Sequence, residues 1–198
     1  MRDFWESRYG NDEYVYGKTP NLFFKNTIGE LEPGALFMPG EGEGRNVVYA
    51  AELGWKVEAM DLTTTGREKA FLLAAEKGVK ITYNTGDILN YPLKPGSYDL
   101  IALIYFHLPS TIRTSIHVKL SEALNKNGIL ILEAFTKKQM GQTTGGPQNL
   151  DLLYDMASLK SDFKELKIES LYETEQNLNE GPFHQGKSYQ VRLIARKL

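Results

Sequence analysis

Between residues 35 and 135 the sequence alternates short apolar runs with longer amphipathic stretches, and this alternation constrains the fold more than any other feature. Strands are expected at residues 35–38, 56–60, 79–83, 98–105 and 128–135, and helices at residues 43–53, 66–77 and 109–125. The run at 98–105 is almost wholly apolar, as in a central strand covered on both faces. Strands that alternate with helices predict an α/β fold with a doubly wound, mostly parallel sheet and right-handed crossovers.

The two ends of the chain differ from this pattern. The first 30 residues are rich in aromatic side chains and predict short helices and loops, with a break or a helix start at Pro20-Asn21. Near the other end, two strands are expected at residues 163–172 and 188–195, joined by a long turn-rich segment without a helix. Such strands pair antiparallel or lie apart. We expect one structural domain, with residues 1–30 as an N-terminal segment and residues 31–198 as the main body.

Composition excludes several functional classes. The net charge is −2 and the basic residues are scattered, which disfavours nucleic-acid binding. No run approaches the roughly 18 apolar residues of a membrane span. The absence of cysteine excludes disulfides and thiolate metal sites, and it suits a reducing cytoplasm. The sequence has no compact cluster of histidines and carboxylates, so no metal site is expected.

Three motifs at the expected carboxyl ends of the strands point to a ligand. Glycines at 40, 42 and 44 lie between the first strand and the first helix, where they allow a tight turn and close approach of backbone to ligand. Asp61 follows about twenty residues later, the spacing at which a carboxylate grips a ribose diol. Asp87 follows the third strand and is suited to an adenine amino group. Asp61 is alternatively a helix N-cap, and Asp87 a turn cap. Together these motifs favour an adenosine-containing ligand.

These residues resemble those of class I S-adenosylmethionine-dependent methyltransferases, above all the small bacterial branch with TehB-like and thiopurine methyltransferase-like enzymes. The resemblance rests on Gly-Glu-Gly-Glu-Gly-Arg-Asn at residues 40–46, on the strand that ends at Asp61, on Gly86-Asp87 and on Tyr98-Asp-Leu-Ile. It extends to the aromatic N-terminus, which includes Tyr-Gly-Lys-Thr-Pro-Asn at residues 16–21. Glu-Gly-Pro-Phe-His at residues 180–184 also matches, so the resemblance spans nearly the whole chain.

The resemblance implies a seven-stranded, Rossmann-like sheet with an antiparallel last strand and S-adenosylmethionine as cofactor. It also implies a role for each of ten residues: Gly40 and Gly42 against the methionine part, Asp61 on the ribose with Leu62 beside it, Asp87 and Ile88 at the adenine, Ile104 and Tyr105 next to the transferring methyl group, and Tyr9 and Tyr16 in an N-terminal segment over the cofactor.

One departure from the family lies at the start of the loop. The family usually has an acidic residue two positions before the first glycine, where this chain has Met38. Pro39 stands where an aliphatic residue is common, and Glu41 fills a position that is often small. The usual acid helps to organise the loop, so Glu41 is a candidate to compensate.

Three histidines are candidates for proton transfer to or from an acceptor. His107 follows the fourth expected strand and is the candidate general base, or alternatively a structural hydrogen-bonding group. His184 precedes the last strand and is a second candidate, whereas His117 is expected to be solvated. The loop at residues 140–147 is either a mobile substrate lid or a connector.

The expected function is therefore methyl transfer to a small-molecule acceptor, and the sequence does not define the oligomeric state. One alternative is a non-catalytic S-adenosylmethionine-binding sensor or accessory protein, which the missing acid at Met38 keeps open. The other is a nicotinamide-dependent oxidoreductase. That reading is disfavoured because the third glycine of its fingerprint is absent, with Arg45 or Val47 in its place.

Overall fold

The computed structural model describes all 198 residues, and its strands form a seven-stranded sheet in the order β3-β2-β1-β4-β5-β7-β6. The chain divides into two compact units. The first contains Met1–Tyr91 together with Glu180–Phe183, and the second contains Pro92–Asn179 together with His184–Leu198. The N-terminal 30 residues therefore belong to the same unit as the glycine-rich loop.

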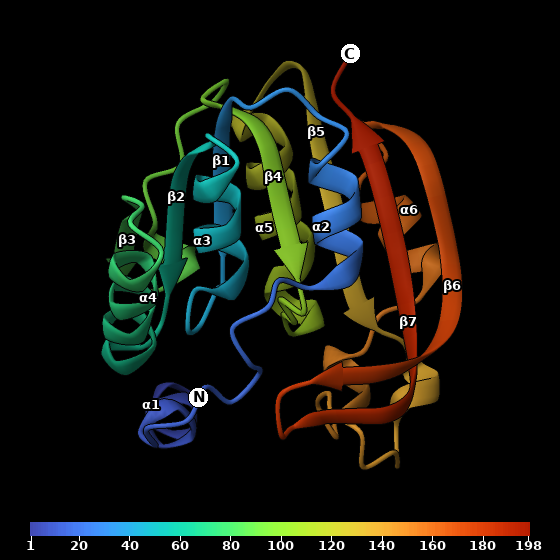
Figure 1. Cartoon of the computed structure of the whole chain (residues 1–198). Helices are drawn as coiled ribbons and strands as arrows, with labels where there is room; N and C mark the ends of the chain where they lie inside the picture. Colours follow the sequence, from blue (N-terminus) through green and yellow to red (C-terminus); the bar gives the residue numbers. More distant parts are fainter. The chain divides into compact units, whose positions relative to one another are not determined.

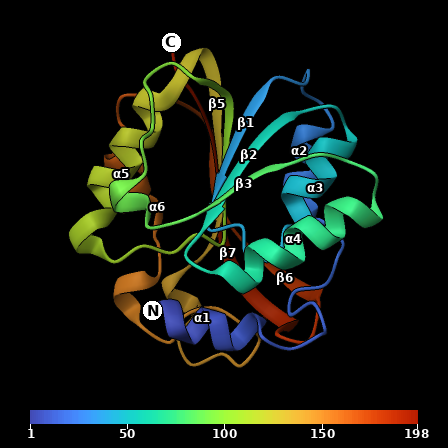
Figure 2. The same ribbon diagram turned by 90° about the vertical axis from the view of Figure 1, so that its left-hand side faces the viewer.

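The first unit contains three parallel strands and four helices. Its elements are α1 (Arg2–Tyr9), α2 (Leu22–Ile28), β1 (Ala35–Pro39), α3 (Arg45–Glu52), β2 (Lys56–Asp61), α4 (Thr64–Glu76) and β3 (Thr82–Thr85). β2 pairs in parallel with both β1 and β3. Helices α3 and α4 lie on the same side of these strands (Figures 1 and 2). The predicted helix start after Pro20 is confirmed, because the Asn21 side chain caps α2 by accepting a hydrogen bond from the Phe24 amide.

The second unit contains the remaining strands. Its elements are β4 (Tyr98–Ile104), α5 (Ser110–Ala123), β5 (Leu124–Phe135), α6 (Met156–Asp162), β6 (Lys167–Glu180) and β7 (His184–Arg196), of which β6 ends at a residue of the first unit. β4 and β5 are parallel, and β5 and β7 are antiparallel. Helices α5 and α6 lie on one side of these strands (Figure 2). The predicted antiparallel C-terminal strand is therefore present.

One expectation for the tail was wrong, and one helix before it was missed. The strands β6 and β7 are longer than predicted and leave only residues 181–183 between them, so the long turn-rich connector does not exist. Helix α6 was not predicted at all. Its start is marked by Asp155, which accepts a hydrogen bond from the Ser158 amide, a capping pattern that is visible in the sequence.

The start of α3 lies close against α4 because Gly44 has no side chain. Gly44 adopts φ +87°, and a Cβ at this position would lie 2.5 Å from the Cβ of Ala70 and 2.8 Å from its Cα. Ala70 is fully buried on α4. Two small residues thus bring the glycine-rich loop into contact with α4, and neither position tolerates a larger side chain.

We predict that Gly44→Ala destabilises the protein by about 2–5 kcal/mol, because it adds left-handed backbone strain to a steric overlap with Ala70. Urea unfolding measures the loss. Gly54→Ala is the matched control: its φ is +88° and nothing lies within 4 Å of its Cβ position, so it adds strain alone, about 1 kcal/mol. Equal losses in the two variants would show that close packing at Gly44 contributes nothing.

Candidate active site

The glycine-rich loop between β1 and α3 is held by hydrogen bonds from β2 and β3. The Gly40 amide donates to the Met60 carbonyl at 2.8 Å, and the Tyr83 hydroxyl donates to the Gly42 carbonyl at 2.7 Å. Gly40 and Gly42 have φ of +66° and +61°, a region that glycine enters without penalty. The loop is therefore fixed where its glycines are expected to contact a ligand.

Glu41 organises the loop by capping α3. Its Oε1 accepts hydrogen bonds from the amides of Asn46 and Val47, both at 2.8 Å, and its Oε2 accepts one from the Asn46 side chain at 3.3 Å. The side chain is buried, and burial raises the pKa of the carboxyl to about 7 against the opposing effect of these donors. Glu41 thus performs the organising role expected of the acid that Met38 replaces.

Asp61, at the end of β2, also binds the loop, a role that was missed from the sequence. Its Oδ2 accepts a hydrogen bond from the Gly42 amide at 3.1 Å, while Oδ1 accepts from the amide and hydroxyl of Thr63 at 2.9 and 2.7 Å. A carboxylate has about four acceptor positions, and three are filled. Asp61 can hold a ribose diol as expected only if the Thr63 hydroxyl turns away.

Glu41 and Asp61 share an electrostatic property that no other buried acid in the chain has. Five carboxylates are buried, and three of them pair with a cationic side chain: Glu43 with Lys69, Glu133 with Arg192, and Asp162 with Arg113. Glu41 and Asp61 bind only neutral donors. Burial raises the pKa of both carboxyls. Once both carboxyls are ionised, which for Glu41 requires a pH above about 7, two negative charges without an ion-pair partner lie beside Gly42.

The N-terminal helix α1 lies against this loop. A Cβ on Gly42 would lie 2.6 Å from the hydroxyl oxygen of Tyr9, which is buried and stacks on Trp5. The Glu6 carboxylate accepts hydrogen bonds from the amides of Thr64 and Thr65 and from the Thr65 hydroxyl, so α1 caps the first turn of α4 (Figure 2). These donors lower the Glu6 pKa.

Three of the segments that carry the family resemblance, residues 16–21, 40–46 and 180–184, are joined by one hydrogen-bonded network. Arg45 donates to the Tyr16 carbonyl at 3.1 Å and to Glu180 at 2.9 Å. Asn21 donates through its amide to Asn46 at 2.8 Å and through its side chain to Glu180 at 3.2 Å. These motif residues hold the N-terminal segment and the β6–β7 turn against α3, so their role is structural.

The remaining predicted cofactor residues of this unit lie after β2 and β3, except Tyr16, which lies between α1 and α2. Asp87 is exposed and caps a short 3₁₀ helix, Ile88–Asn90, by accepting a hydrogen bond from the Leu89 amide at 3.0 Å. Ile88 is buried, and Leu62 is half-buried. Tyr16 contributes its carbonyl to Arg45, and burial raises the pKa of its hydroxyl. The contacts of Asp87 are those of a capping residue. Its role at the adenine stays a prediction.

In the second unit, one of the two residues predicted to lie next to the transferring methyl group has a strained backbone. Ile104 ends β4 and is buried, and Tyr105 follows with φ +53°, an uncommon conformation for an aromatic residue. Its ring stacks on Phe135 at 4.7 Å and meets the edge of His184 at 4.8 Å. Backbone strain of this kind gathers at functional sites and persists only where the surroundings enforce it.

His107 has both ring nitrogens within hydrogen-bonding distance of the backbone. Nδ1 lies 2.6 Å from the Leu152 carbonyl oxygen, and the Phe135 amide donates to Nε2 at 3.4 Å. These contacts fit one neutral tautomer, and burial lowers the pKa to about 4. They are the contacts of a structural histidine and give the general-base hypothesis no support.

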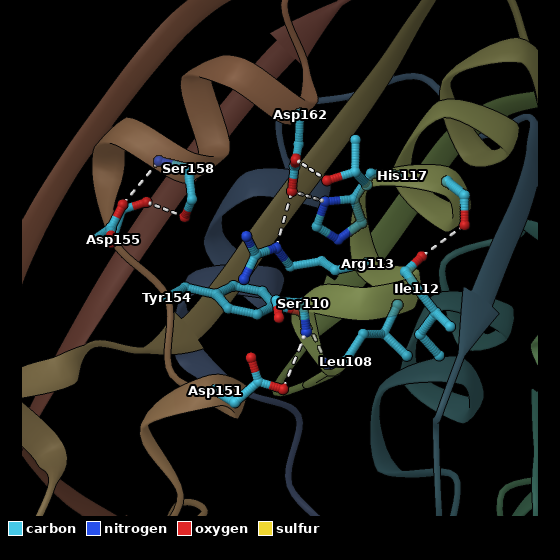
Figure 3. A network of polar contacts seen from close by, with 12 residues as sticks. Leu108, Ser110, Ile112, Arg113, His117, Asp151, Tyr154, Asp155, Ser158 and Asp162 are labelled. Atoms are coloured by element: carbon cyan, nitrogen blue, oxygen red, sulfur yellow. Dashed lines mark hydrogen bonds and ion pairs between the residues drawn. The ribbon is translucent and has the colours of Figure 1, made fainter.

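The segment after β4 is clamped by residues 150–162 (Figure 3). The hydroxyl of fully buried Tyr154 accepts from the Leu108 amide and donates to the Phe106 carbonyl, both at 3.0 Å. At the end of α6, Asp162 binds Arg113 and Thr114 of α5 at 3.0 and 2.7 Å. This clamp enforces the conformation in which Tyr105 is strained.

The expectation that His117 is solvated was wrong. The side chain is fully buried, its Nδ1 lies 2.9 Å from Asp162, and its ring stacks on Phe163 at 4.6 Å (Figure 3). Burial lowers its pKa. The pattern of α5 predicted that this face is exposed, because helix α6, which covers it, was not predicted.

The loop at residues 140–147 is tied down by side chains. Buried Gln139 donates to the Thr144 hydroxyl and the Gly145 carbonyl, and it accepts from the Tyr189 amide, at 2.9–3.0 Å. A Cβ on Gly146 would lie 2.8 Å from the ring of Phe135. The loop therefore packs on the same aromatic cluster that holds Tyr105, and its role as a substrate lid or as a connector stays a prediction.

We predict that Glu41 makes stability depend on pH. A folded-state pKa of about 7, above the usual 4.5, means that its stabilising contribution is complete below pH ~4.5 and is lost as pH rises through ~7. Wild-type stability should therefore fall by up to about 3 kcal/mol relative to Glu41→Gln between pH 5 and pH 8. Urea unfolding of both proteins at the two pH values measures this difference, and parallel stabilities would refute the prediction.

Comparison with known proteins agrees with this fold. The family described as a methyltransferase domain matches residues 39–128, and no curated protein matches the sequence. The chain superposes along its full length on a structure titled "Conversion of a Disulfide Bond into a Thioacetal Group during Echinomycin Biosynthesis" (TM-score 0.80, 15% identity, 92% of that chain).

Two further structures match over the whole of this chain. They are TehB from Haemophilus influenzae (TM-score 0.74, 18% identity, 67% of that chain) and magnesium protoporphyrin IX methyltransferase from Synechocystis with bound S-adenosylhomocysteine (TM-score 0.71, 18% identity, 98% of that chain). Likeness at these identities establishes the Rossmann-like methyltransferase fold, and the matched domain carries the glycine-rich loop and Asp61. Residues 39–128 therefore match a methyltransferase domain, and the whole chain has the Rossmann-like fold of S-adenosylmethionine-dependent methyltransferases.

Proposed function

We propose that this protein transfers the methyl group of S-adenosylmethionine to a small-molecule nucleophile. The observation that carries the proposal is the pair of buried carboxylates, Glu41 and Asp61, which have no cationic partner and flank Gly42. A buried charge without a counter-ion is destabilising. A ligand with a sulfonium and an ammonium group would supply the positively charged partner that these carboxylates do not have in the protein.

The same geometry disfavours a nicotinamide cofactor. Dinucleotide-binding folds bring the pyrophosphate to the amides at a helix N-terminus. In this chain the amides of Asn46 and Val47 are already bound by the Glu41 carboxylate. A pyrophosphate would have to displace a buried anion and would then lie near Asp61.

The geometry also weakens the case for a non-catalytic sensor or accessory protein. That alternative rested on the missing acid at Met38, and the hydrogen bonds of Glu41 supply the loop organisation that the missing acid would give.

We assign the cofactor roles as follows: Gly40 and Gly42 to the methionine part, Asp61 with Leu62 to the ribose, Asp87 and Ile88 to the adenine, Tyr9 and Tyr16 to the cover, and Ile104 to the methyl end. When bound, S-adenosylmethionine supplies a methyl group whose bond to sulfur breaks, leaving its electron pair on sulfur, while a lone pair of the acceptor forms the new bond. The chain's own contribution is to align the two reactants and exclude water.

The neutral, hydrogen-bonded state of His107 favours an acceptor that needs no general base, such as one that is already ionised in solution. The chain would act in the cytoplasm, where the absence of cysteine fits a reducing environment.

We predict that S-adenosylhomocysteine binds in isothermal titration calorimetry and that NADH does not. Asp61→Asn should weaken binding by about tenfold, since it replaces a carboxylate acceptor with a neutral amide of the same shape. Thermal unfolding of the variant serves as the control for folding. Preferential binding of NADH, or no binding of S-adenosylhomocysteine, would refute the proposed function.

A further inference from the structure

The glycine-rich loop has an excess of negative charge that no ion pair neutralises, because Arg45, whose charge lowers the pKa of Glu41, is itself paired with Glu180. The cationic side chains nearest to the loop are already committed, Lys69 to Glu43 at 2.6 Å and Arg45 to Glu180 at 2.9 Å. The donors to Glu41 and Asp61 are amides and a hydroxyl, which carry no net charge. The two carboxylates are 8% exposed each, so solvent screens them weakly.

The substrate and product forms of the cofactor differ by one unit of charge and one methyl group. S-adenosylmethionine carries a sulfonium, and S-adenosylhomocysteine carries a neutral thioether at the same position. The two share their adenosine and amino acid groups. Contacts to those shared groups, including the effect of a carboxylate on the α-ammonium, therefore contribute equally to both ligands. Only S-adenosylmethionine also presents a sulfonium to the field of a buried carboxylate.

We propose that Glu41 and Asp61 make the site selective for the cationic, methyl-donating cofactor over its neutral product, so that the loss of charge on transfer weakens binding and favours product release. This inference rests on the proposed function and extends it to the discrimination between the two cofactor forms. Glu41 acts as a positioning and specificity residue. It fixes the loop through α3 and contributes charge from a position that is often small in the family.

The hydrogen bonds of Glu41 allow charge and shape to be separated. Both backbone amides donate to the same oxygen, Oε1, so the amide oxygen of a glutamine can accept both bonds in Glu41→Gln. Only the weaker contact at 3.3 Å from the Asn46 side chain is lost. The variant therefore removes the charge and keeps the cap on α3. Glu76→Gln removes the same charge from an exposed carboxylate on α4 that pairs with Lys18, which makes it the matched control.

The test is calorimetric titration of the whole protein at pH 8, where Glu41 is mostly ionised, with S-adenosylhomocysteine and with sinefungin, a stable analogue that carries a protonated amine near the position of the sulfonium. Wild type should prefer sinefungin. Glu41→Gln should reduce sinefungin affinity about tenfold, because it removes one unit charge from a partly screened site, and should change S-adenosylhomocysteine affinity less than about threefold. Glu76→Gln should leave both affinities as in wild type, and thermal unfolding checks that each variant is folded.

The outcomes separate this inference from the proposed function. If both ligands bind and Glu41→Gln weakens them equally, or wild type shows no preference for sinefungin, the charge selectivity is refuted while methyl transfer stands. If Glu41→Gln does not fold, Asp61→Asn replaces it: both ligands should lose the ribose contact, and sinefungin should lose the charge interaction in addition. Equal loss for both ligands then refutes the inference. If neither ligand binds to wild type, the proposed function itself fails.

Discussion

The hydrogen bonds between the Glu41 carboxylate and the first turn of α3 are the interaction on which the glycine-rich loop depends. They fix where the helix begins, and with it the positions of Asn46 and Arg45. Those two side chains in turn hold the N-terminal segment through Asn21 and Tyr16. One carboxylate therefore connects the shape of the loop to the segment that covers it, and a family position usually filled by an acid can be apolar here.

The second unit is organised by different means. Its polar groups pair with each other, as in the contacts among Arg113, His117 and Asp162 (Figure 3), and its histidines lie against aromatic rings. A buried network of this kind favours one conformation, although the Nε2 of His117 has no hydrogen-bond partner. Here it fixes the segment after β4, in which Tyr105 is strained. The unit therefore contributes rigid shape rather than charge, in contrast to the unit that holds the glycine-rich loop.

The sequence predicted most of the alternating strands and helices because their apolar periodicity and their glycine boundaries are local signals. It also identified the loop and Asp61 as neighbours, since parallel strands end at a common edge. It did not reveal that Asp61 binds the loop amide of Gly42, because that contact depends on backbone geometry. His117 was misjudged for a related reason: its burial comes from α6, a seven-residue helix whose only clear signal is the cap at Asp155. The network of Arg45, Asn21 and Glu180 spans 159 residues of sequence, and no local pattern encodes such a contact.

The turn between β6 and β7 has a consequence for how the protein is made. Glu180 and Gly181 belong to the compact unit formed by the first 91 residues, and a Cβ on Gly181 would lie 2.5 Å from the backbone of Gly17 and Val15. A ribosome releases the N-terminal residues long before it reaches position 180, and domains generally fold as units. The first unit therefore cannot complete its packing during most of synthesis. The contacts of Asn21 and Arg45 with Glu180 can form only after residues 180–183 have emerged.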